Sequence, residues 1–232
     1  MRVLDILYPP ACPFCGEVQK PGTGICGSCK ESLPMIREPR CMKCGKPLSR
    51  EEQEYCRDCG NRNYAFEQGR SLWLHVPPVS KAIYQFKFHN KRYYAEIFAR
   101  ELAHEYEGWI RDRGIEELIP VPLHPSRRRM RGYNQAELLA KELSKELQIP
   151  AAKNVVFRVR RTKPQKQLDD RGREQNLQGA FGISRQWKAP ASVLVVDDIY
   201  TTGSTIHKIS KLLIRAGVEK VYFLTISIGQ GL

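Results

Sequence analysis

From residue 63 onward, short apolar runs alternate with stretches in which apolar residues recur every three or four positions. Apolar runs bounded by turn residues predict buried strands at 69–76, 118–123, 154–160, 193–198 and 218–227. The longer periodicity predicts helices at 79–88, 93–111, 134–147 and 205–215. Strands that alternate with helices predict an α/β fold, with a mostly parallel sheet and helices on both faces.

The first 62 residues follow neither pattern and contain all eight cysteines, arranged as four C-x-x-C pairs. The cysteines are Cys12, Cys15, Cys26, Cys29, Cys41, Cys44, Cys56 and Cys59. A C-x-x-C turn directs two thiolates at one metal ion, and two turns complete a tetrahedral zinc site. With no ligand position left open, the pattern predicts two structural zinc sites. We therefore divide the chain into a zinc-ribbon module, 1–62, and a larger domain, 63–232.

Two pairings of the cysteines fit this spacing. The sequential pairing places the first four cysteines at one ion and the last four at the other, whereas a crossed pairing swaps the middle pairs. We favour the sequential pairing because it closes shorter loops. Disulfides are one competing interpretation, but they are not expected without an export signal, and the N-terminal apolar stretch is too short for one. A redox C-x-x-C is the other, but four copies with no cysteine elsewhere fit metal ligation better. No run of 18 apolar residues occurs. We expect a cytoplasmic protein without membrane insertion.

Positive charge is concentrated in the middle of the chain. The formal net charge is +13, and residues 120–173 carry 14 basic and 5 acidic side chains. Most of these basic residues fall in two predicted loops, 121–135 and 161–176. Focused positive charge predicts a polyanionic ligand such as pyrophosphate, a nucleotide or nucleic acid. A solvated surface is the alternative interpretation.

The most specific chemistry lies where the predicted strand 193–198 ends. Two carboxylates, Asp197 and Asp198, follow the apolar run and can accept hydrogen bonds from sugar hydroxyls. The turn after them consists of Thr201, Thr202, Gly203, Ser204 and Thr205. Because this turn opens a helix, its free N–H groups and the helix dipole suit a phosphate group. The alternative is a plain strand end followed by a helix cap, which requires neither the acid pair nor five such loop residues.

The two basic loops should meet the same edge of the sheet, because ligands of parallel sheets lie at the carboxyl ends of the strands. The loop 121–135 carries Arg127, Arg128, Arg129 and Arg131. Four guanidinium groups beside a helix start form a strong pyrophosphate site. The loop 161–176 is polar, and we expect it to close over the site as a lid, with an ordinary exposed loop as the alternative.

The stretch from Val196 to Thr205 resembles the phosphoribosyl-pyrophosphate (PRPP) loop of type I phosphoribosyltransferases. The whole chain resembles the ComF family of competence-associated phosphoribosyltransferase-like proteins. Besides that stretch and the cysteines, the resemblance rests on Val121, Pro122, Leu123, Arg128, Arg131, Gly132, Tyr133, Asn134, Gln135, Gln167, Leu168, Arg171, Asn176, Gly179, Ala180 and Phe181. It implies a double zinc ribbon joined to a type I phosphoribosyltransferase fold. It also implies a role in DNA uptake, with incoming single-stranded DNA and competence proteins such as a helicase as partners.

The resemblance also implies roles for individual residues. Asp197 and Asp198 would hold the ribose hydroxyls of PRPP or a related phosphorylated ribose, and the turn 201–205 would cradle its 5′-phosphate. Mg²⁺ would bridge pyrophosphate and ribose, while Arg128 and Arg131 neutralise the leaving pyrophosphate. An acceptor would displace that pyrophosphate from C1. Salvage enzymes for 6-oxopurines have an acid at the position of Thr201, so we do not expect hypoxanthine or guanine as the acceptor.

Two functions fit the sequence. The first is Mg²⁺-dependent phosphoribosyl transfer. The second is a non-catalytic module for single-stranded nucleic acid on the same scaffold, in which the basic segment 120–173, Tyr133 and the zinc module provide phosphate contacts and base stacking.

Overall fold

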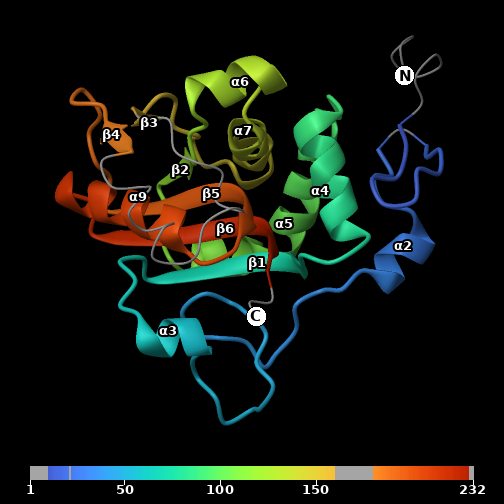
Figure 1. The fold of residues 1–232 in the computed structure, drawn as a ribbon, viewed down its shortest axis with the longest axis horizontal. Helices are drawn as coiled ribbons and strands as arrows, with labels where there is room; N and C mark the ends of the chain where they lie inside the picture. Colours follow the sequence, from blue (N-terminus) through green and yellow to red (C-terminus); the bar gives the residue numbers. More distant parts are fainter. Residues whose placement is uncertain (1–9, 21, 160–179, 230–232) are drawn as a thin grey trace.

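The computed structural model describes residues 10–20, 22–159 and 180–229, and a four-stranded parallel sheet forms its centre (Figure 1). The strands lie in the order β1-β6-β5-β2. Their bounds are Gln68–Leu74 for β1, Glu117–Pro120 for β2, Ser192–Tyr200 for β5 and Lys220–Ile228 for β6. All neighbouring strands in this sheet are parallel. The strands predicted at 69–76, 118–123, 193–198 and 218–227 are therefore confirmed.

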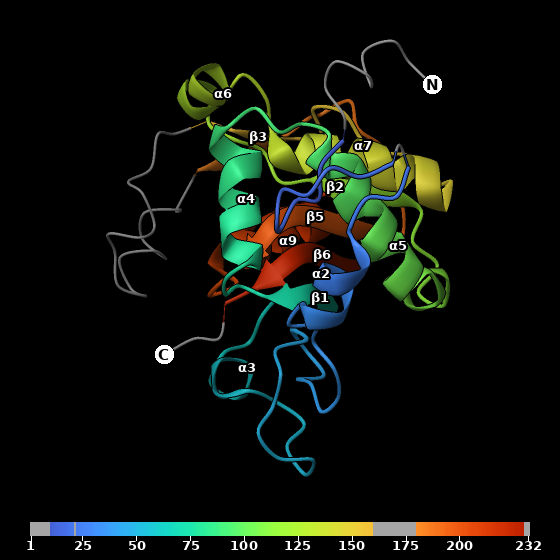
Figure 2. The same ribbon diagram turned by 90° about the vertical axis from the view of Figure 1, so that its right-hand side faces the viewer.

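Helices cover both faces of the sheet (Figures 1 and 2). The helices are α4 (Val79–Phe88), α5 (Tyr94–Arg111), α7 (Gln135–Leu147) and α9 (Ser204–Arg215). Successive residues of a strand point to opposite faces. In β5, Leu194 and Val196 pack in the cluster with α4, α5 and α7, whereas Val193 and Val195 pack in the cluster with α9. Burial on both faces explains why β5 is a continuous apolar run in the sequence.

The strand predicted at 154–160 exists but lies outside the parallel sheet. It spans Val156–Arg158 (β3) and pairs antiparallel with β4 (Phe181–Ile183), a strand that the sequence analysis did not predict. Val156 is buried while Phe157 is 42% exposed. This one-sided burial is typical of a two-stranded ribbon that lies on a domain surface rather than of an interior strand.

The first predicted basic loop contains a helix, α6 (Pro125–Arg131), which corrects the interpretation of 121–135 as irregular. Proline occupies the first helical position, and the ring of His124 accepts a hydrogen bond from the Ser126 N–H. Gly132 ends the helix in the left-handed conformation, with φ of 79°. The second predicted loop, 161–176, lies outside the described residues.

The zinc module wraps around the edge strand β1. The segment 34–36 joins the two ribbons and runs antiparallel along β1: the Ile36 N–H donates to the Leu72 carbonyl at 3.1 Å, and the Leu74 N–H donates to the Pro34 carbonyl at 2.9 Å. The ribbons contain the short helices α2 (Gly27–Ser32) and α3 (Arg57–Asn61). Because each ribbon shares a buried cluster with the sheet, a domain boundary at residue 62 stays a prediction from the sequence.

Among the helices that the structure describes, none has both the length and the apolar character needed to span a bilayer.

Candidate functional site

The two predicted carboxylates lie side by side near the carboxyl end of β5. The N–H of Asp198 donates to Oδ1 of Asp197 at 2.9 Å. Asp198 is buried and Asp197 is half-buried. Removal from water and the neighbouring Asp198 carboxylate raise the pKa of Asp197 above its ordinary range, although Lys87 and Arg131 act in the opposite direction. Two carboxylates in this setting attract a cation or hydroxyl donors.

Lys87, in the last turn of α4, supplies a positive charge next to Asp198. Its Nζ lies 2.8 Å from Oδ1 of Asp198, and the two side chains are only 17% and 12% exposed. Sequence reasoning missed Lys87, because a lysine in the last turn of a helix is ordinary and gives no sign of a distant partner. The pair brings α4 and β5 together at the site.

Arg131, at the end of α6, acts electrostatically on both aspartates. Its Nη1 donates to Oε1 of Gln135 at 2.9 Å, and its guanidinium carbon lies 4.6 Å from the centroid of the Phe88 ring. Burial lowers the pKa of Arg131, while Asp198 and, more weakly, Asp197 raise it. The Nε of Arg131 is buried and has no hydrogen-bond partner within the described chain. This unused donor is suited to an incoming anion.

The other arginine predicted for the site is engaged elsewhere. Nη1 of Arg128 lies 2.8 Å from Oε1 of Glu137 on α7, and the two side chains are 53% and 37% exposed. An exposed ion pair of this kind contributes little stability and can open readily. The structure thus brings Arg131 to the aspartates and pairs Arg128 with Glu137.

Arg158 of β3 is a further cation at the site that the sequence analysis did not select. Burial and the neighbouring Arg127 lower its pKa to about 10, while Asp197 raises it. Its guanidinium carbon lies 5.4 Å from the centroid of the Phe181 ring. Tyr133, by contrast, is only 6% exposed, and its hydroxyl donates to the Phe86 carbonyl. Tyr133 therefore offers no ring face for stacking, contrary to the expectation from the sequence.

The turn predicted to hold a phosphate connects β5 to α9. Gly203 has φ of 74°, and a Cβ built there would lie 2.4 Å from the hydroxyl oxygen of Tyr200. Only glycine fits this position, for reasons of backbone conformation and of space. The Oγ1 of Thr202 and the Oγ of Ser204 are 3.0 Å apart, and the N-cap residue of α9, Gly203, has no side chain that could cap the helix.

Residues just after the zinc module hold this turn in place. The hydroxyl of Tyr64 donates to the Thr202 carbonyl at 2.8 Å, and the Ala65 N–H donates to Nδ1 of His207 in α9 at 2.9 Å. Burial raises the pKa of Tyr64 to about 12, so its hydroxyl remains a donor at neutral pH. These contacts were missed because they join residues far apart in the sequence: Tyr64 and Thr202 are 138 positions apart.

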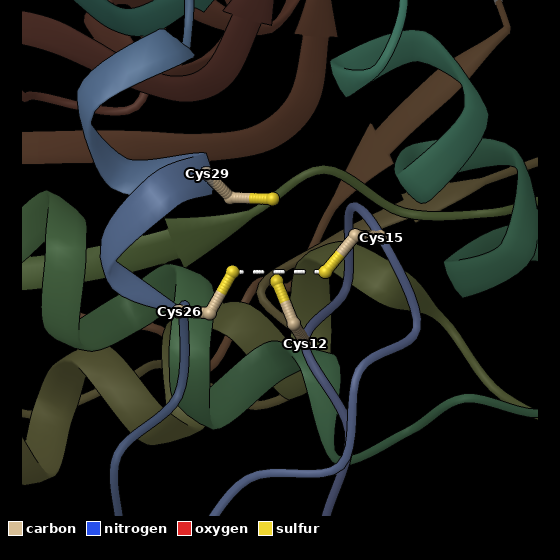
Figure 3. Close-up of side chains that lie close together, drawn as sticks. All are labelled: Cys12, Cys15, Cys26 and Cys29. Atoms are coloured by element: carbon tan, nitrogen blue, oxygen red, sulfur yellow. Dashed lines mark hydrogen bonds between the residues drawn. The ribbon is translucent and has the colours of Figure 1, made fainter.

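The eight cysteines form two groups, each with its sulfur atoms within 4.8 Å of one another. The groups are Cys12, Cys15, Cys26 and Cys29, and Cys41, Cys44, Cys56 and Cys59. Figure 3 shows the first group converging on one point. The Sγ atoms of Cys15 and Cys26 are 3.6 Å apart, as are those of Cys44 and Cys56. Tetrahedral zinc with Zn–S bonds of about 2.3 Å requires about 3.8 Å between sulfurs, so both groups fit the ion. The sequential pairing is confirmed.

Comparisons with known proteins agree with both halves of this description. Residues 3–60 match the family model for the double zinc ribbon domain, and residues 133–227 match the model for the phosphoribosyl transferase domain. Competence protein F of Haemophilus influenzae is 36% identical over 219 residues, which cover 90% of this chain and 93% of that protein. DNA utilization protein YhgH of Escherichia coli K12 is 31% identical over 201 residues, which cover 85% of this chain and 87% of that protein.

Two further similarities are weaker. Competence protein ComFC of Bacillus subtilis is 27% identical over 205 residues, which cover 85% of this chain and 81% of that protein. Among solved structures, adenine phosphoribosyltransferase from Saccharomyces cerevisiae is 14% identical, and the match covers 60% of this chain and 72% of that one, with a TM-score of 0.38.

Proposed function

Because the chain belongs to the ComF family, with a phosphoribosyltransferase-type parallel sheet behind a double zinc ribbon, we propose that it binds PRPP together with Mg²⁺. Its relatives are competence and DNA utilization proteins, which supports a role in DNA uptake. The observation that carries the proposal is the aspartate pair beside a turn that only glycine permits, together with Arg131, which interacts electrostatically with both acids and has a spare donor.

The aspartates are the proposed ribose site. Asp197 and Asp198 accept hydrogen bonds from the ribose 2′- and 3′-hydroxyls, and the ion pair with Lys87 holds the Asp198 side chain in place for that contact. The raised pKa of Asp197 supports a site that is completed by positive charge, because a cation favours the ionised carboxylate. When bound beside Asp197 and Asp198, Mg²⁺ would supply positive charge that neutralises the pyrophosphate.

The turn 201–205 is the proposed site for the 5′-phosphate. Backbone N–H groups at the start of α9 and the hydroxyls of Thr202 and Ser204 can donate to the phosphate oxygens. Because Gly203 has no Cβ, the backbone can approach the anion closely. Thr201 is exposed at the entrance to the turn.

Arg131 is the proposed contact for the leaving pyrophosphate, with Arg128 joining once its exposed pair with Glu137 opens. Stabilisation of negative charge that develops on the pyrophosphate is the largest electrostatic contribution to such a transfer. If the chain is an enzyme, the C1–oxygen bond to pyrophosphate breaks while C1 bonds to the acceptor. The proposal includes a cytoplasmic location, where reduced thiolates are available to zinc, and partners among the competence proteins, such as a helicase.

Titration calorimetry with PRPP and Mg²⁺ tests this function. Asp197→Asn/Asp198→Asn should weaken PRPP binding about tenfold or more, since a hydrogen bond to a charged group contributes about 1.5–3 kcal/mol. Asp112→Asn is the matched control, because Asp112 is exposed and precedes the amino end of β2. The proposal fails if the wild type does not bind PRPP, or if the double variant binds as the wild type does.

The second candidate function is a non-catalytic module for single-stranded nucleic acid. Exposed arginines on α6 favour it, because Arg128 and Arg129 project into solvent beside the site. The plot of log affinity against log salt should have a negative slope. Arg128→Ala/Arg129→Ala should make that slope less steep, by about 0.7 for each phosphate that is no longer neutralised. An unchanged slope in this variant would exclude α6 as the phosphate-binding surface.

A further inference from the structure

The outer side of α4 exposes aromatic side chains that the fold does not need. Tyr84 is 55% exposed and Phe88 is 46% exposed. They lie four residues apart, one turn of the helix, with ring centroids 4.8 Å apart and planes inclined by 43°. The ring of His89 lies 5.6 Å from that of Tyr84. We call Tyr84, Phe88 and His89 the aromatic platform.

The core does not explain the platform, because α4 already buries a complete apolar side. The buried residues of the helix are Val79, Ala82, Ile83 and Phe86. Phe86 is fully buried, while Phe88, two positions later, faces outward. Two large aromatic rings exposed together on one side of a helix are unusual for a solvated surface and indicate a binding role.

The segment that carries the platform is basic. Residues 81–93 contain Lys81, Lys87, Lys91 and Arg92 and no aspartate or glutamate. From α6, the guanidinium of Arg131 lies 4.6 Å from the centroid of Phe88. The partner must therefore offer flat apolar faces for the rings and negative charge for the cations. Single-stranded nucleic acid meets both needs, with bases that stack and phosphates that bind the cations.

We propose that the aromatic platform binds single-stranded nucleic acid by stacking successive bases on Tyr84 and Phe88. This inference rests on the nucleic-acid binding proposed above, and it places the stacking surface on α4 rather than at the buried Tyr133. Lys87, in the same turn as the platform, is held by Asp198. A strand on the platform therefore passes beside the proposed ribose site, with its phosphates toward Lys91 and Arg131.

The test compares two labelled strands by fluorescence anisotropy: an oligothymidylate of about 20 nucleotides and an abasic strand of the same length. The wild type should bind the oligothymidylate more tightly. Tyr84→Ala/Phe88→Ala should lose about tenfold in affinity for the oligothymidylate, within the range for loss of stacking, and should keep its affinity for the abasic strand. Tyr84→Trp/Phe88→Trp should restore the preference for bases.

Controls separate this inference from the functions on which it builds. Tyr55→Ala removes an aromatic ring of similar exposure, 49%, from the zinc module and should change nothing. Tyr84→Ala alone, which leaves Phe88 in contact with Arg131, should lose part of the preference for bases and keep its PRPP affinity, while Asp197→Asn/Asp198→Asn should keep the preference for bases.

Three outcomes would overturn the platform. The first is a double alanine variant that retains the preference for bases. The second is a loss on both strands alike, and the third is a loss in Tyr55→Ala of the same size. If the wild type binds neither the oligothymidylate nor the abasic strand, nucleic-acid binding itself is refuted and, with it, the platform. Absence of PRPP binding alone would refute only the ribose site.

Discussion

Each of the two zinc ribbons has four cysteine ligands, but the ribbons contact different faces of the sheet. The first packs beside α5, where the ring of Phe14 meets those of Trp73 and Phe98 and Lys30 pairs with Glu101. The second lies in the same buried cluster as Tyr200 and as Tyr64, which holds the phosphate turn. The difference teaches that one repeated metal motif can have two roles: the first ribbon supports the helical layer, whereas the second supports the candidate site.

The strongest way to test this comparison is to remove the second metal site. In Cys44→Ser, zinc content should fall from about two to one per chain, and the unfolding free energy should drop by several kcal/mol, because metal binding is coupled to folding. PRPP affinity should fall with it, since the turn 201–205 loses its support through Tyr64. Zinc analysis, thermal unfolding and calorimetry on one preparation measure all three.

The matched change at the first site is Cys12→Ser, at a cysteine that is also fully buried. It should lose the same amount of zinc and a comparable amount of stability. At a temperature where both variants are folded, however, its PRPP affinity should stay near that of the wild type, because this ribbon contacts α5 rather than the turn. Equal losses of PRPP affinity in both cysteine variants would remove the distinction between the ribbons.

Gly203→Ala should have the next largest effect. The new Cβ meets the Tyr200 hydroxyl at a backbone angle that only glycine adopts easily, so the unfolding free energy should fall by about 1–3 kcal/mol. Urea denaturation measures the change. Gly108→Ala is the control, because Gly108 is exposed in α5 with nothing near its Cβ, and there alanine should stabilise by about 1 kcal/mol.

Tyr64→Phe should have the smallest effect and the most specific one. It removes a single hydrogen bond to the Thr202 carbonyl, which contributes about 1 kcal/mol, and leaves the stacking of the ring on Phe66 in place. PRPP affinity should weaken a few-fold with zinc content unchanged. Tyr55→Phe, at an exposed tyrosine, should leave PRPP affinity as it is. If Tyr64→Phe also leaves that affinity unchanged, the second ribbon does not act on the turn through this hydrogen bond.

Much of the fold follows from local signals in the sequence. The predicted bounds of α4 match the structure because its buried apolar residues keep a clear helical period from Val79 to Phe86. The strands β5 and β6 are long apolar runs. The sequential zinc pairing was predicted because it closes shorter loops than the crossed pairing. Helix α6 was missed because four arginines leave it without an apolar side. Strand β4 is three residues long and too short to show a period.

The candidate site likewise has one part that the sequence predicts and another part that it does not. The acid pair and the turn after it form one contiguous motif, so the sequence contains them whole. Lys87, Arg158 and Tyr64 reach the site from other elements, and each has an ordinary local context. Their roles depend on tertiary packing, which no local period encodes. The same reasoning explains Tyr133, whose aromatic ring suggests stacking in the sequence but is covered by Phe86 in the fold.

The antiparallel pairing of segment 34–36 with β1 has a consequence for handling the protein. Unpaired N–H and C=O groups on a sheet margin recruit strands from other molecules, and here the linker between the ribbons satisfies them. A cysteine cluster flanks that linker on each side. A chelator that removes zinc from both clusters would therefore release the linker and expose the edge of β1. Metal-stripped preparations should therefore self-associate strand to strand, and zinc supplied during purification would protect solubility as well as folding.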